Sequence, residues 1–172
     1  GRVIDVNNGY EGDGPMTPQR SGGVPSSGLV QMCFSGKYTE RDIKLKLRGK
    51  GGLVAYTGTS DVKDLEEFIR TGVKRPGSMI FCTREQAEEA RDAMVYQIAK
   101  YIGAMAVVLK GQVDFIALTG GLMHSKVIPQ KIGEYVGWLA PLYVFPGSEE
   151  KIALREAAQR ALEDPSCVKR YV

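Results

Sequence analysis

Apolar residues recur along this chain at spacings that predict helices alternating with strands. The longest helical pattern covers 84–109, and a capping box of Thr83 and Gln86 precedes it. Because 104–109 is apolar on all sides, we expect that end of the helix to be buried. The apolar positions of this pattern, three or four residues apart, are Ala87, Ala90, Met94, Ile98, Ile102, Met105 and Leu109.

Shorter patterns predict the other elements of the fold. Ser26 or Ser27 is expected to cap the first helix. Helices are predicted over 26–34, 39–48, 61–71, 125–138 and 149–162, and strands over 3–6, 53–56, 113–118 and 142–145. Strands alternating with helices are typical of a layered α/β fold, which binds ligands at the carboxyl ends of its strands.

The segment 39–48 supports two interpretations. Thr39 and Asp42 resemble a capping box, which favours a helix. Ile43, Leu45 and Leu47 alternate with cations, which is the period of a strand. In both interpretations the predicted element ends at the glycine-rich segment 49–52.

Composition places the chain among ordinary globular proteins. It has 172 residues, 43% of them hydrophobic and 25% charged, and a net charge of +3. These values argue against disorder, collagen and coiled coil, and the length predicts one domain or two small ones. A sequence pI near 8.7 without a long basic run does not indicate nucleic-acid binding. No apolar stretch approaches the roughly 20 residues of a membrane helix, so we expect a soluble protein.

The cysteines and the first residues bear on cellular context. Three cysteines, Cys33, Cys82 and Cys167, stand far apart without a CxxC pair, which is typical of reduced thiols in the cytoplasm. The chain opens at 1–5 without methionine and already in a strand-like pattern. We therefore expect it to be the back part of a longer protein.

Three glycine turns are candidate ligand sites: 20–23, 56–59 and 118–121. Glycines let the backbone approach a phosphate or a purine, and the helix that follows offers amide donors, although glycines often serve turns alone. No P-loop is present. His124 is the only histidine, and a surface position near a helix start explains it more simply than a catalytic base.

Long strings in this chain resemble butyrate kinases and occur in the family's order. The similarity extends from the first residue to about 165 and is interrupted only around 72–85, where 72–83 looks like an addition. The strings are 1–8, 12–15, 20–23, 31–43, 49–66, 93–122 and 144–150. Butyrate kinases belong with acetate kinases to the superfamily of sugar kinases, heat-shock chaperone ATPases and actin.

This resemblance implies an actin-like ATPase domain of the ribonuclease H-like α/β type, with a mixed sheet flanked by helices. Family members have two such domains with the active site between them, and 1–172 resembles the single C-terminal one. The implied reaction is the reversible transfer of the ATP γ-phosphoryl group to the butyrate carboxylate, giving ADP and butyryl phosphate, with Mg²⁺. The full-length enzyme is expected to be a cytoplasmic homo-oligomer without nucleic-acid or membrane partners.

The resemblance also implies nucleotide-binding residues in two segments. The first, 57–63, resembles the segment that lines the nucleoside in acetate kinases, but Val62 and Lys63 depart from the family's aromatic residue and arginine, which weakens base stacking at 62. The second, 119–122 with Ser125, resembles the superfamily's adenosine motif. The cofactor-binding residues so implied are Gly58, Asp61, Val62, Lys63, Gly120, Gly121, Leu122 and Ser125.

A catalytic and a metal role are implied for three further residues. Arg20 resembles the acetate kinase arginine thought to contact the transferring phosphoryl group, a role that suits a guanidinium fork. Glu149 and Glu150 lie where acetate kinases have a glutamate implicated with Mg²⁺, and either could correspond. Helix capping alone would also explain both glutamates.

Parts of the family's active site have no counterpart in this sequence. The His-Leu-Gly-Gly-Gly phosphate turn, the catalytic histidine, the first phosphate-binding loop and a second substrate arginine would all precede residue 1. We therefore expect the isolated chain to bind nucleotide weakly and to catalyse little. Two alternatives stay open: a non-catalytic nucleotide-binding or interaction module, and a sister kinase for acetate, propionate or a branched short-chain acid.

Overall fold

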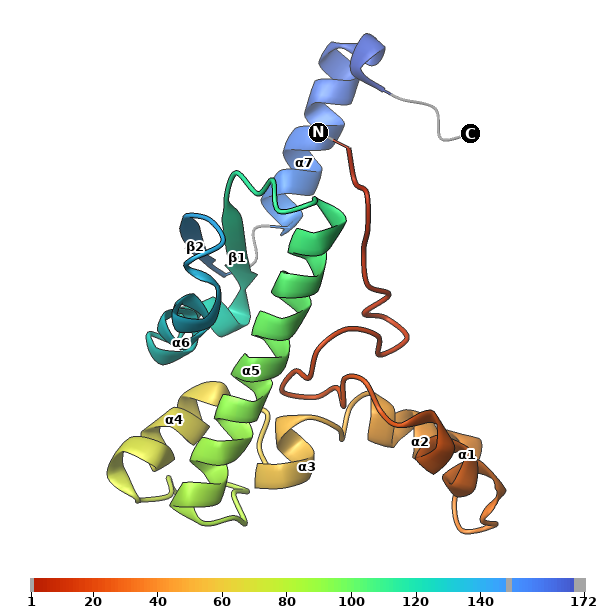
Figure 1. The fold of residues 1–172 in the computed structure, drawn as a ribbon, viewed down its shortest axis with the longest axis vertical. Coiled ribbons are helices and arrows are strands. Elements are labelled where there is room, and N and C mark those ends of the chain that lie inside the picture. The colour runs from red at the N-terminus through yellow and green to blue at the C-terminus, as the bar shows by residue number, and fades with distance from the viewer. Residues whose placement is uncertain (1, 148–149, 169–172) are drawn as a thin grey trace.

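The chain is arranged around one long helix and a small parallel sheet (Figure 1). The computed structural model describes residues 2–147 and 150–168. Its α-helices are α1 (Ser26–Phe34), α2 (Glu40–Leu47), α3 (Leu53–Thr57), α4 (Val62–Thr71), α5 (Arg84–Val108), α6 (Val127–Val136) and α7 (Glu150–Glu163). Its strands are β1 (Ile116–Gly120) and β2 (Leu142–Pro146), and its 3₁₀ helices are η1 (Gly121–His124) and η2 (Pro165–Cys167).

Helix α5 runs through the middle of the molecule, with α3 and α4 beside its first half (Figure 1). The predicted capping box is confirmed, because the Thr83 hydroxyl accepts from the Gln86 amide at 3.2 Å and the Gln86 side chain accepts from the Thr83 amide at 3.0 Å. Met94 and Val95 are buried where α3, α4 and α6 pack against the helix. This helix therefore carries the centre of the core.

Strands β1 and β2 form a two-stranded parallel sheet in which Ile116 lies opposite Leu142. The chain crosses from one to the other through η1 and α6, since parallel strands need a crossover connection. Ile128 and Ile132 of α6 are fully buried in the same core as Ile116. The predicted α/β class is confirmed.

A charged cluster joins α5 to α6. Arg91 is only 4% exposed, and it donates to Asp92 at 2.8 Å and to Glu88 at 3.0 Å. Asp92 also pairs with Lys131 of α6 at 3.0 Å. Burial acts to raise the pKa of Asp92, but hydrogen bonds from Arg91 and Lys131 outweigh it and hold the pKa below its ordinary value.

The helices α1 and α2 form a separate lobe at one side of the molecule (Figure 1). At α2 the helical interpretation is confirmed, because Thr39 and Asp42 form the capping box. An exposed ion pair between Lys44 and Glu40, one helical turn apart, adds to the helix. The capping bonds outweigh the alternating pattern of this segment.

Helix α1 spans the predicted residues 26–34 but has a different N-cap from the one predicted. Pro25 is its N-cap with φ −60° and ψ 122°, and no side chain caps the helix. Ser26 and Ser27 lie inside the first turn, so the prediction that one of them caps the helix is wrong. The proline turns the chain one residue earlier than a serine cap would. None of the residues of α1 is buried.

The predicted strand over 53–56 is wrong, because these residues form α3. The amide of Leu53 donates to the carbonyl of Thr17 at 3.2 Å, and that of Val54 to Pro18 at 3.1 Å. The Thr57 hydroxyl closes the helix by donating to the Leu53 carbonyl at 2.8 Å. A short apolar run fits one buried helical turn as well as a strand, and contacts with the loop before α1 decide the outcome.

Two further predictions fail at the segments 3–6 and 104–109, which the rest of the described chain leaves largely exposed. The segment 3–6 is not a strand, and Val3 and Val6 are 79% and 77% exposed. A strand needs the hydrogen bonds of a neighbour, and none of the described strands pairs with this segment. The end of α5 is buried on one side only, because Ala106 is 7% exposed and Val107 is 76% exposed.

The remaining elements agree with the predictions to within a few residues. Strand β1 begins at Ile116 instead of 113 and continues to Gly120, while α6 begins at Val127 after η1. The helix predicted over 149–162 is α7, and Glu149, one of the two glutamates that helix capping would explain, lies outside the described residues.

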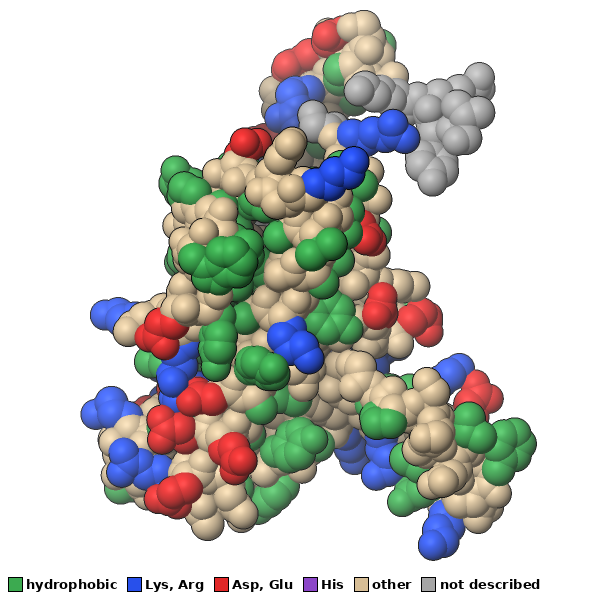
Figure 2. Space-filling view, in the orientation of Figure 1, with side chains coloured by type: hydrophobic (Ala, Val, Ile, Leu, Met, Phe, Trp, Pro, Cys, Tyr) green, Lys and Arg blue, Asp and Glu red, His purple; other side chains and the backbone are tan. Residues whose placement is uncertain are grey.

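The molecular surface mixes charged and apolar side chains. Figure 2 shows acidic side chains over α4 and the start of α5, and Lys and Arg side chains around the α1–α2 lobe. Large apolar side chains also reach the surface, including Tyr56, Phe81 and Phe145. No helix in the described part of the chain combines the length and the hydropathy needed to cross a bilayer.

Candidate functional site

A cavity of about 610 Å³ opens where the start of α4 meets the segment that follows β1. It lies beyond the carboxyl end of β1, where α/β folds place their ligands. The residues that line the cavity are Pro18, Ser60, Asp61, Val62, Lys63, Glu66, Gly121, Leu122, His124 and Ser125.

This cavity brings together the two segments that the sequence associates with a nucleoside. Residues 61–63 form one wall and 121–125 contribute the other, although they are far apart in the chain. Of the predicted cofactor-binding residues, the cavity is lined by Asp61, Val62, Lys63, Gly121, Leu122 and Ser125, and is not lined by Gly58 and Gly120.

Gly58 and Gly120 have structural roles in the turns that lead to the site. Gly58 ends α3 at φ +89°, and a Cβ there would lie 2.2 Å from the Met79 carbonyl oxygen. Gly120 ends β1 at φ +98° and exchanges two backbone hydrogen bonds with Gly147, at 3.0 and 3.2 Å. The left-handed backbone and the close approach at Gly58 each require glycine.

Asp61 begins α4 and caps it. Its carboxylate accepts from the amides of Lys63 at 2.9 Å and Asp64 at 3.2 Å. Its own amide donates to the Thr59 hydroxyl at 3.0 Å. The turn 57–61 therefore holds Asp61 as an N-cap, and the amides of Lys63 and Asp64 at the start of α4 are already bonded within the protein.

Ser125 has the same function at the start of α6. Its hydroxyl oxygen accepts from the amides of Val127 at 3.1 Å and Ile128 at 3.0 Å. The hydroxyl proton is donated to Glu66 of α4 at 2.5 Å. Ser125 thus caps one helix and bonds to the other across the cavity.

The electrostatics of the cavity follow from these bonds. Both helix starts that reach it are capped by side chains, so the capped amides cannot hold a phosphate. Asp61 and Glu66 place carboxylates on the wall, and Lys63 is the cation. A ligand portion that is uncharged and carries hydroxyl or amino donors fits this wall better than a phosphate chain does.

Arg20 lies outside the cavity, in the turn 17–21. Its amide donates to the Thr17 hydroxyl at 3.0 Å, and the backbone of this turn pairs with that of Arg48. A Cβ at Gly9 would lie 3.0 Å from a guanidinium nitrogen of Arg20, so the Arg20 side chain rests against the backbone at Gly9. Arg20 forms no ion pair with any described residue.

The turn that carries Arg20 adjoins the cavity. Pro18 lines the cavity, and the Gln19 amide group donates to the Ser60 hydroxyl at 3.2 Å. A ligand that fills the cavity and extends past Pro18 would therefore approach Arg20.

Glu66 is a lining residue that the sequence analysis missed. Its position was available from helical spacing, because residues three and four apart lie on one face, and Glu66 follows Val62 and Lys63 by these steps. His124 also lines the cavity and is exposed, in agreement with its expected surface position near a helix start.

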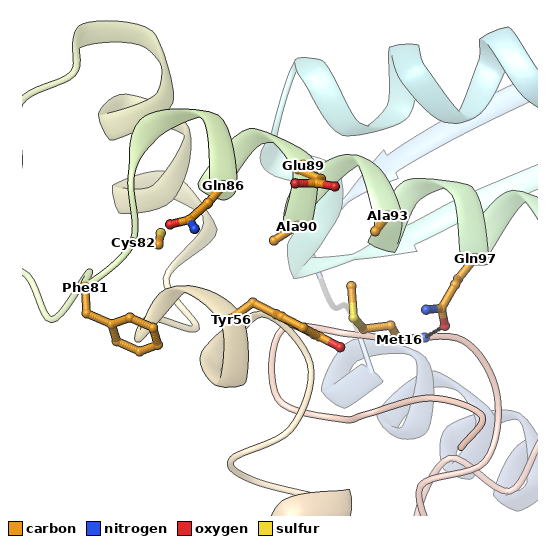
Figure 3. A pocket seen from close by; sticks show the side chains of 9 residues that line it. All are labelled: Met16, Tyr56, Phe81, Cys82, Gln86, Glu89, Ala90, Ala93 and Gln97. Atoms are coloured by element: carbon orange, nitrogen blue, oxygen red, sulfur yellow. Dashed lines mark hydrogen bonds between the residues drawn. The ribbon is translucent and has the colours of Figure 1, made fainter. Parts of the chain in front are cut away.

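A second cavity of about 630 Å³ lies between α3 and α5 (Figure 3). Its walls are Tyr56, Phe81 and Met16 on one side and α5 on the other. The Gln97 side chain accepts from the Met16 amide at 3.0 Å across it. No residue predicted for the site lines this cavity.

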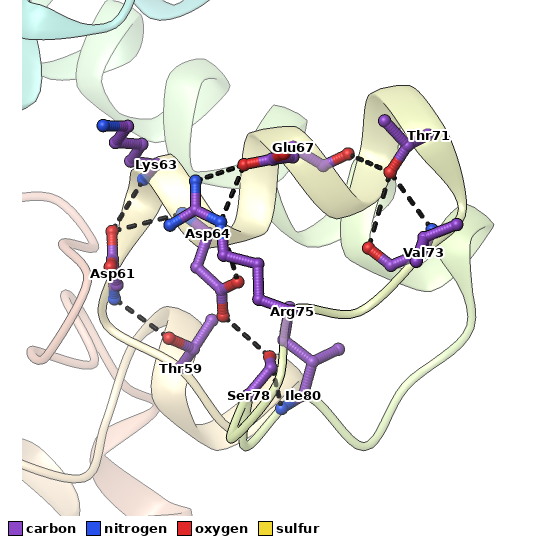
Figure 4. A network of polar contacts seen from close by, with 10 residues as sticks. All are labelled: Thr59, Asp61, Lys63, Asp64, Glu67, Thr71, Val73, Arg75, Ser78 and Ile80. Carbon is purple, nitrogen blue, oxygen red and sulfur yellow. Dashed lines mark hydrogen bonds and ion pairs between the residues drawn. The ribbon is translucent and has the colours of Figure 1, made fainter.

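The segment 72–83 is held on α4 by a polar network (Figure 4). Arg75 pairs with Glu67, and the Ser78 hydroxyl donates to Asp64 at 2.7 Å. The hydrogen bond from Arg75 lowers the pKa of Glu67. The Phe81 amide also donates to the Thr57 carbonyl at 3.0 Å, so the segment supports the turn before the cavity.

The residues predicted to hold a metal are not placed by the structure. Glu149 lies outside the described residues, and so does the side chain of Glu150, the first residue of α7. Within residues 2–147 and 150–168, no three His, Cys, Asp or Glu side chains form a group that could hold a metal ion.

Proteins of similar sequence align with nearly the whole of this chain. Residues 1–132 match the sequence model described as the acetokinase family. A protein of Elusimicrobium minutum named "Probable butyrate kinase" is 57% identical over 172 residues, 99% of this chain and 46% of that protein. One of the same name from Clostridium botulinum (strain Alaska E43 / Type E3) is 42% identical over 171 residues, 99% of this chain and 45% of that protein.

The chain spans just under half the length of these curated relatives. Among solved structures, the acetate kinase of Porphyromonas gingivalis matches with a TM-score of 0.69 at 21% identity, over 86% of this chain and 41% of that one. This likeness shows the fold and confirms the predicted actin-like ATPase class. The match to the family model covers most of the residues, and the chain belongs to the acetokinase family.

Proposed function

We propose that this chain is the nucleotide-binding half of a butyrate kinase. The observation that carries the proposal is the single cavity lined by 61–63 and 121–125, the two segments that resemble nucleoside-binding segments of the superfamily. The names of the relatives at 57% and 42% identity support butyrate as the acceptor.

In this proposal the cavity holds the nucleoside of ATP or ADP. The capped helix starts and the Asp61 carboxylate disfavour phosphate inside the cavity and favour hydroxyl and amino donors. The phosphates then extend past Pro18 toward Arg20. This assignment gives Gly121, Leu122 and Val62 the role of walls, and gives Ser125 a structural part in the site.

Arg20 is proposed to act on the transferring group. A carboxylate oxygen of butyrate forms a bond to the γ-phosphorus while the bond to the bridging oxygen of ADP breaks. The guanidinium would stabilise charge on the phosphoryl oxygens, a role open to Arg20 because no described residue pairs with it. Glu149 and Glu150 stay the proposed Mg²⁺ residues, and we derive no step through the metal.

A second domain and a cytoplasmic homo-oligomer are part of the proposal. Arg20 is the one residue of the described chain that we assign to phosphoryl transfer, and it lies outside the cavity. We therefore assign catalytic turnover to a protein that contains a further domain. The three free cysteines support a reducing compartment.

A binding module without catalysis is the second candidate function, because the cavity can bind a nucleotide without a site for the phosphoryl acceptor. A sister kinase for acetate, propionate or a branched acid is the third.

Filling the cavity should weaken nucleotide binding. In Gly121→Leu the new side chain enters the cavity, and the backbone tolerates it because nothing lies within 4 Å of a Cβ there. Isothermal titration calorimetry should show ADP binding to the chain and a loss of about tenfold or more in this variant, the scale of a blocked pocket. The matched control is Gly28→Leu on α1, which is equally open.

Equal ADP affinity in the chain and in Gly121→Leu would refute the assignment of the cavity. A separate assay addresses the second domain. ATP-dependent formation of butyryl hydroxamate by the 172-residue chain should be negligible beside that of a complete family member, and an equal rate would contradict the need for another domain.

A further inference from the structure

We propose that Glu66 is a positioning residue that sets the separation of the two cavity walls by holding Ser125. This inference rests on the proposed function, because the cavity is taken as the nucleoside site. Neither residue is argued to act on the reacting atoms.

The bond between these residues connects two distant parts of the chain. Glu66 lies on α4 and Ser125 precedes α6, and the serine hydroxyl lies 2.5 Å from the Glu66 carboxylate. Both side chains are partly buried and both line the cavity. Among the residues that the structure describes, no other hydrogen bond or ion pair joins α4 to 121–128.

The hydrogen-bond partners of Ser125 determine where its hydroxyl proton points. A hydroxyl has one proton to donate, and the Ser125 oxygen already accepts from the amides of Val127 and Ile128. Its proton can therefore go only to Glu66 in this geometry. A carboxylate acceptor makes this a charge-assisted hydrogen bond, which is stronger than a neutral one.

The consequence for the site is geometric. Glu66 holds the start of α6, and with it the segment 121–125, at a set distance from 61–63. Without the bond the walls lose their direct polar connection, and their separation depends only on the packing of α4 and α6 against α5. A nucleoside would then have to order the two walls on binding, at a cost in affinity.

The chain offers a matched control on the same helix. Glu67 is the next residue, and its carboxylate pairs with Arg75, a residue of the 72–83 segment that does not line the cavity. Glu66→Ala and Glu67→Ala therefore remove the same group from adjacent positions. Glu66→Gln keeps an oxygen that can accept from Ser125, so it separates the hydrogen bond from the charge.

The test measures ADP affinity of the 172-residue chain by calorimetry. We expect Glu66→Ala to weaken ADP binding about tenfold, Glu66→Gln about threefold or less, and Glu67→Ala about twofold or less. Ser125→Ala and the double variant Glu66→Ala/Ser125→Ala should bind ADP equally, because either change already removes the bond. Urea unfolding of each variant verifies that the fold is retained.

A second readout does not depend on the nucleotide. In the ligand-free chain, the amides of Val127 and Ile128 should exchange with deuterium faster in Glu66→Ala than in Glu67→Ala, because the hydroxyl that holds them loses its anchor.

The possible failures are distinguishable. Unchanged ADP affinity in Glu66→Ala, or equal losses in Glu66→Ala and Glu67→Ala, would overturn the role of Glu66 while the proposed function stands. Independent losses that add in the double variant would overturn the coupling through Ser125. A chain that binds neither ADP nor ATP would overturn the proposed function and this inference together.

Discussion

At Gly58 the backbone has φ +89°, and the Met79 carbonyl oxygen lies 2.2 Å from where a Cβ would stand. The sequence predicts that this glycine contacts the nucleotide, whereas in the structure its lack of a side chain lets residues 79–81 approach the turn. Asp61, which the family resemblance also assigns to the nucleotide, has a structural role as well, because its carboxylate caps α4. At this scale, local hydrogen bonds and close packing explain several residues that the family resemblance assigned to the ligand.

Gly58→Ala should therefore destabilise the fold strongly. The variant combines a left-handed backbone with a clash, and we expect a loss of about 3 kcal/mol in the free energy of unfolding. The control is Gly72→Ala, also left-handed at φ +73° but with open space around it, which should cost about 1 kcal/mol. Urea unfolding measures both, and equal losses would show that the approach of Met79 is unimportant.

Helices and strands differ in how their positions are maintained. Helix α5 has its own capping box and a long buried face, while α6 depends on the cap by Ser125 and on contacts with α5. The ion pair of Lys131 with Asp92, and that of Asp92 with the buried Arg91, attach α6 to α5 through charge. The stability of this contact should therefore depend on pH.

Asp92→Asn should lower stability at neutral pH only. The pKa of Asp92 lies below its ordinary value in the folded chain, so its charge stabilises the fold above the unfolded pKa of about 3.9. That contribution is lost as the pH falls through the lower folded pKa. We expect a loss of about 1 kcal/mol at pH 7, a modest value because Asp92 is partly exposed.

The measurement is urea unfolding of both proteins from pH 7 to pH 2. The difference between them should shrink as the pH falls below about 4 and vanish at the acid end. Asp114→Asn serves as the control, since Asp114 is exposed and forms no ion pair with the described residues. A difference that stays constant with pH would contradict a role for the charge.

The whole molecule divides into a well-packed centre and a less buried lobe. The centre contains α3 to α6 with the sheet, and the buried core cluster lies almost entirely there. The α1–α2 lobe buries only Ile43 among its helical residues, and α1 buries none. The candidate site lies within the centre, between α4 and the segment after β1.

Native-state hydrogen exchange should show this division. Amides in the middle of α5 should be protected at least about a hundredfold more than those of α1, because local opening of α1 exposes little apolar surface. Deuterium uptake followed by mass spectrometry on peptides from 26–34 and 90–100 measures the ratio. Equal protection would show that α1 unfolds only together with the core.

Signals that act over a few residues were sufficient to predict much of this molecule from its sequence. The capping boxes at Thr39 and Thr83 and the buried apolar positions Ala87, Ala90 and Met94 of α5 are confirmed, and so are the strands predicted over 113–118 and 142–145, to within a few residues. Each depends on residues within about one helical turn of one another, so the sequence contains the complete pattern. The family resemblance added the two segments that line the cavity.

Contacts between distant residues decided the rest. Leu53–Thr57 became a helix through bonds to the loop at 17–18, and 3–6 did not become a strand because no described strand pairs with it. The bond between Glu66 and Ser125 joins residues that are 59 positions apart in the chain. Such partners are chosen by packing in three dimensions, and a local pattern does not carry that information. The sequence alone therefore determined most of the elements and the family, and the tertiary structure decided the others and which of their residues meet at the cavity.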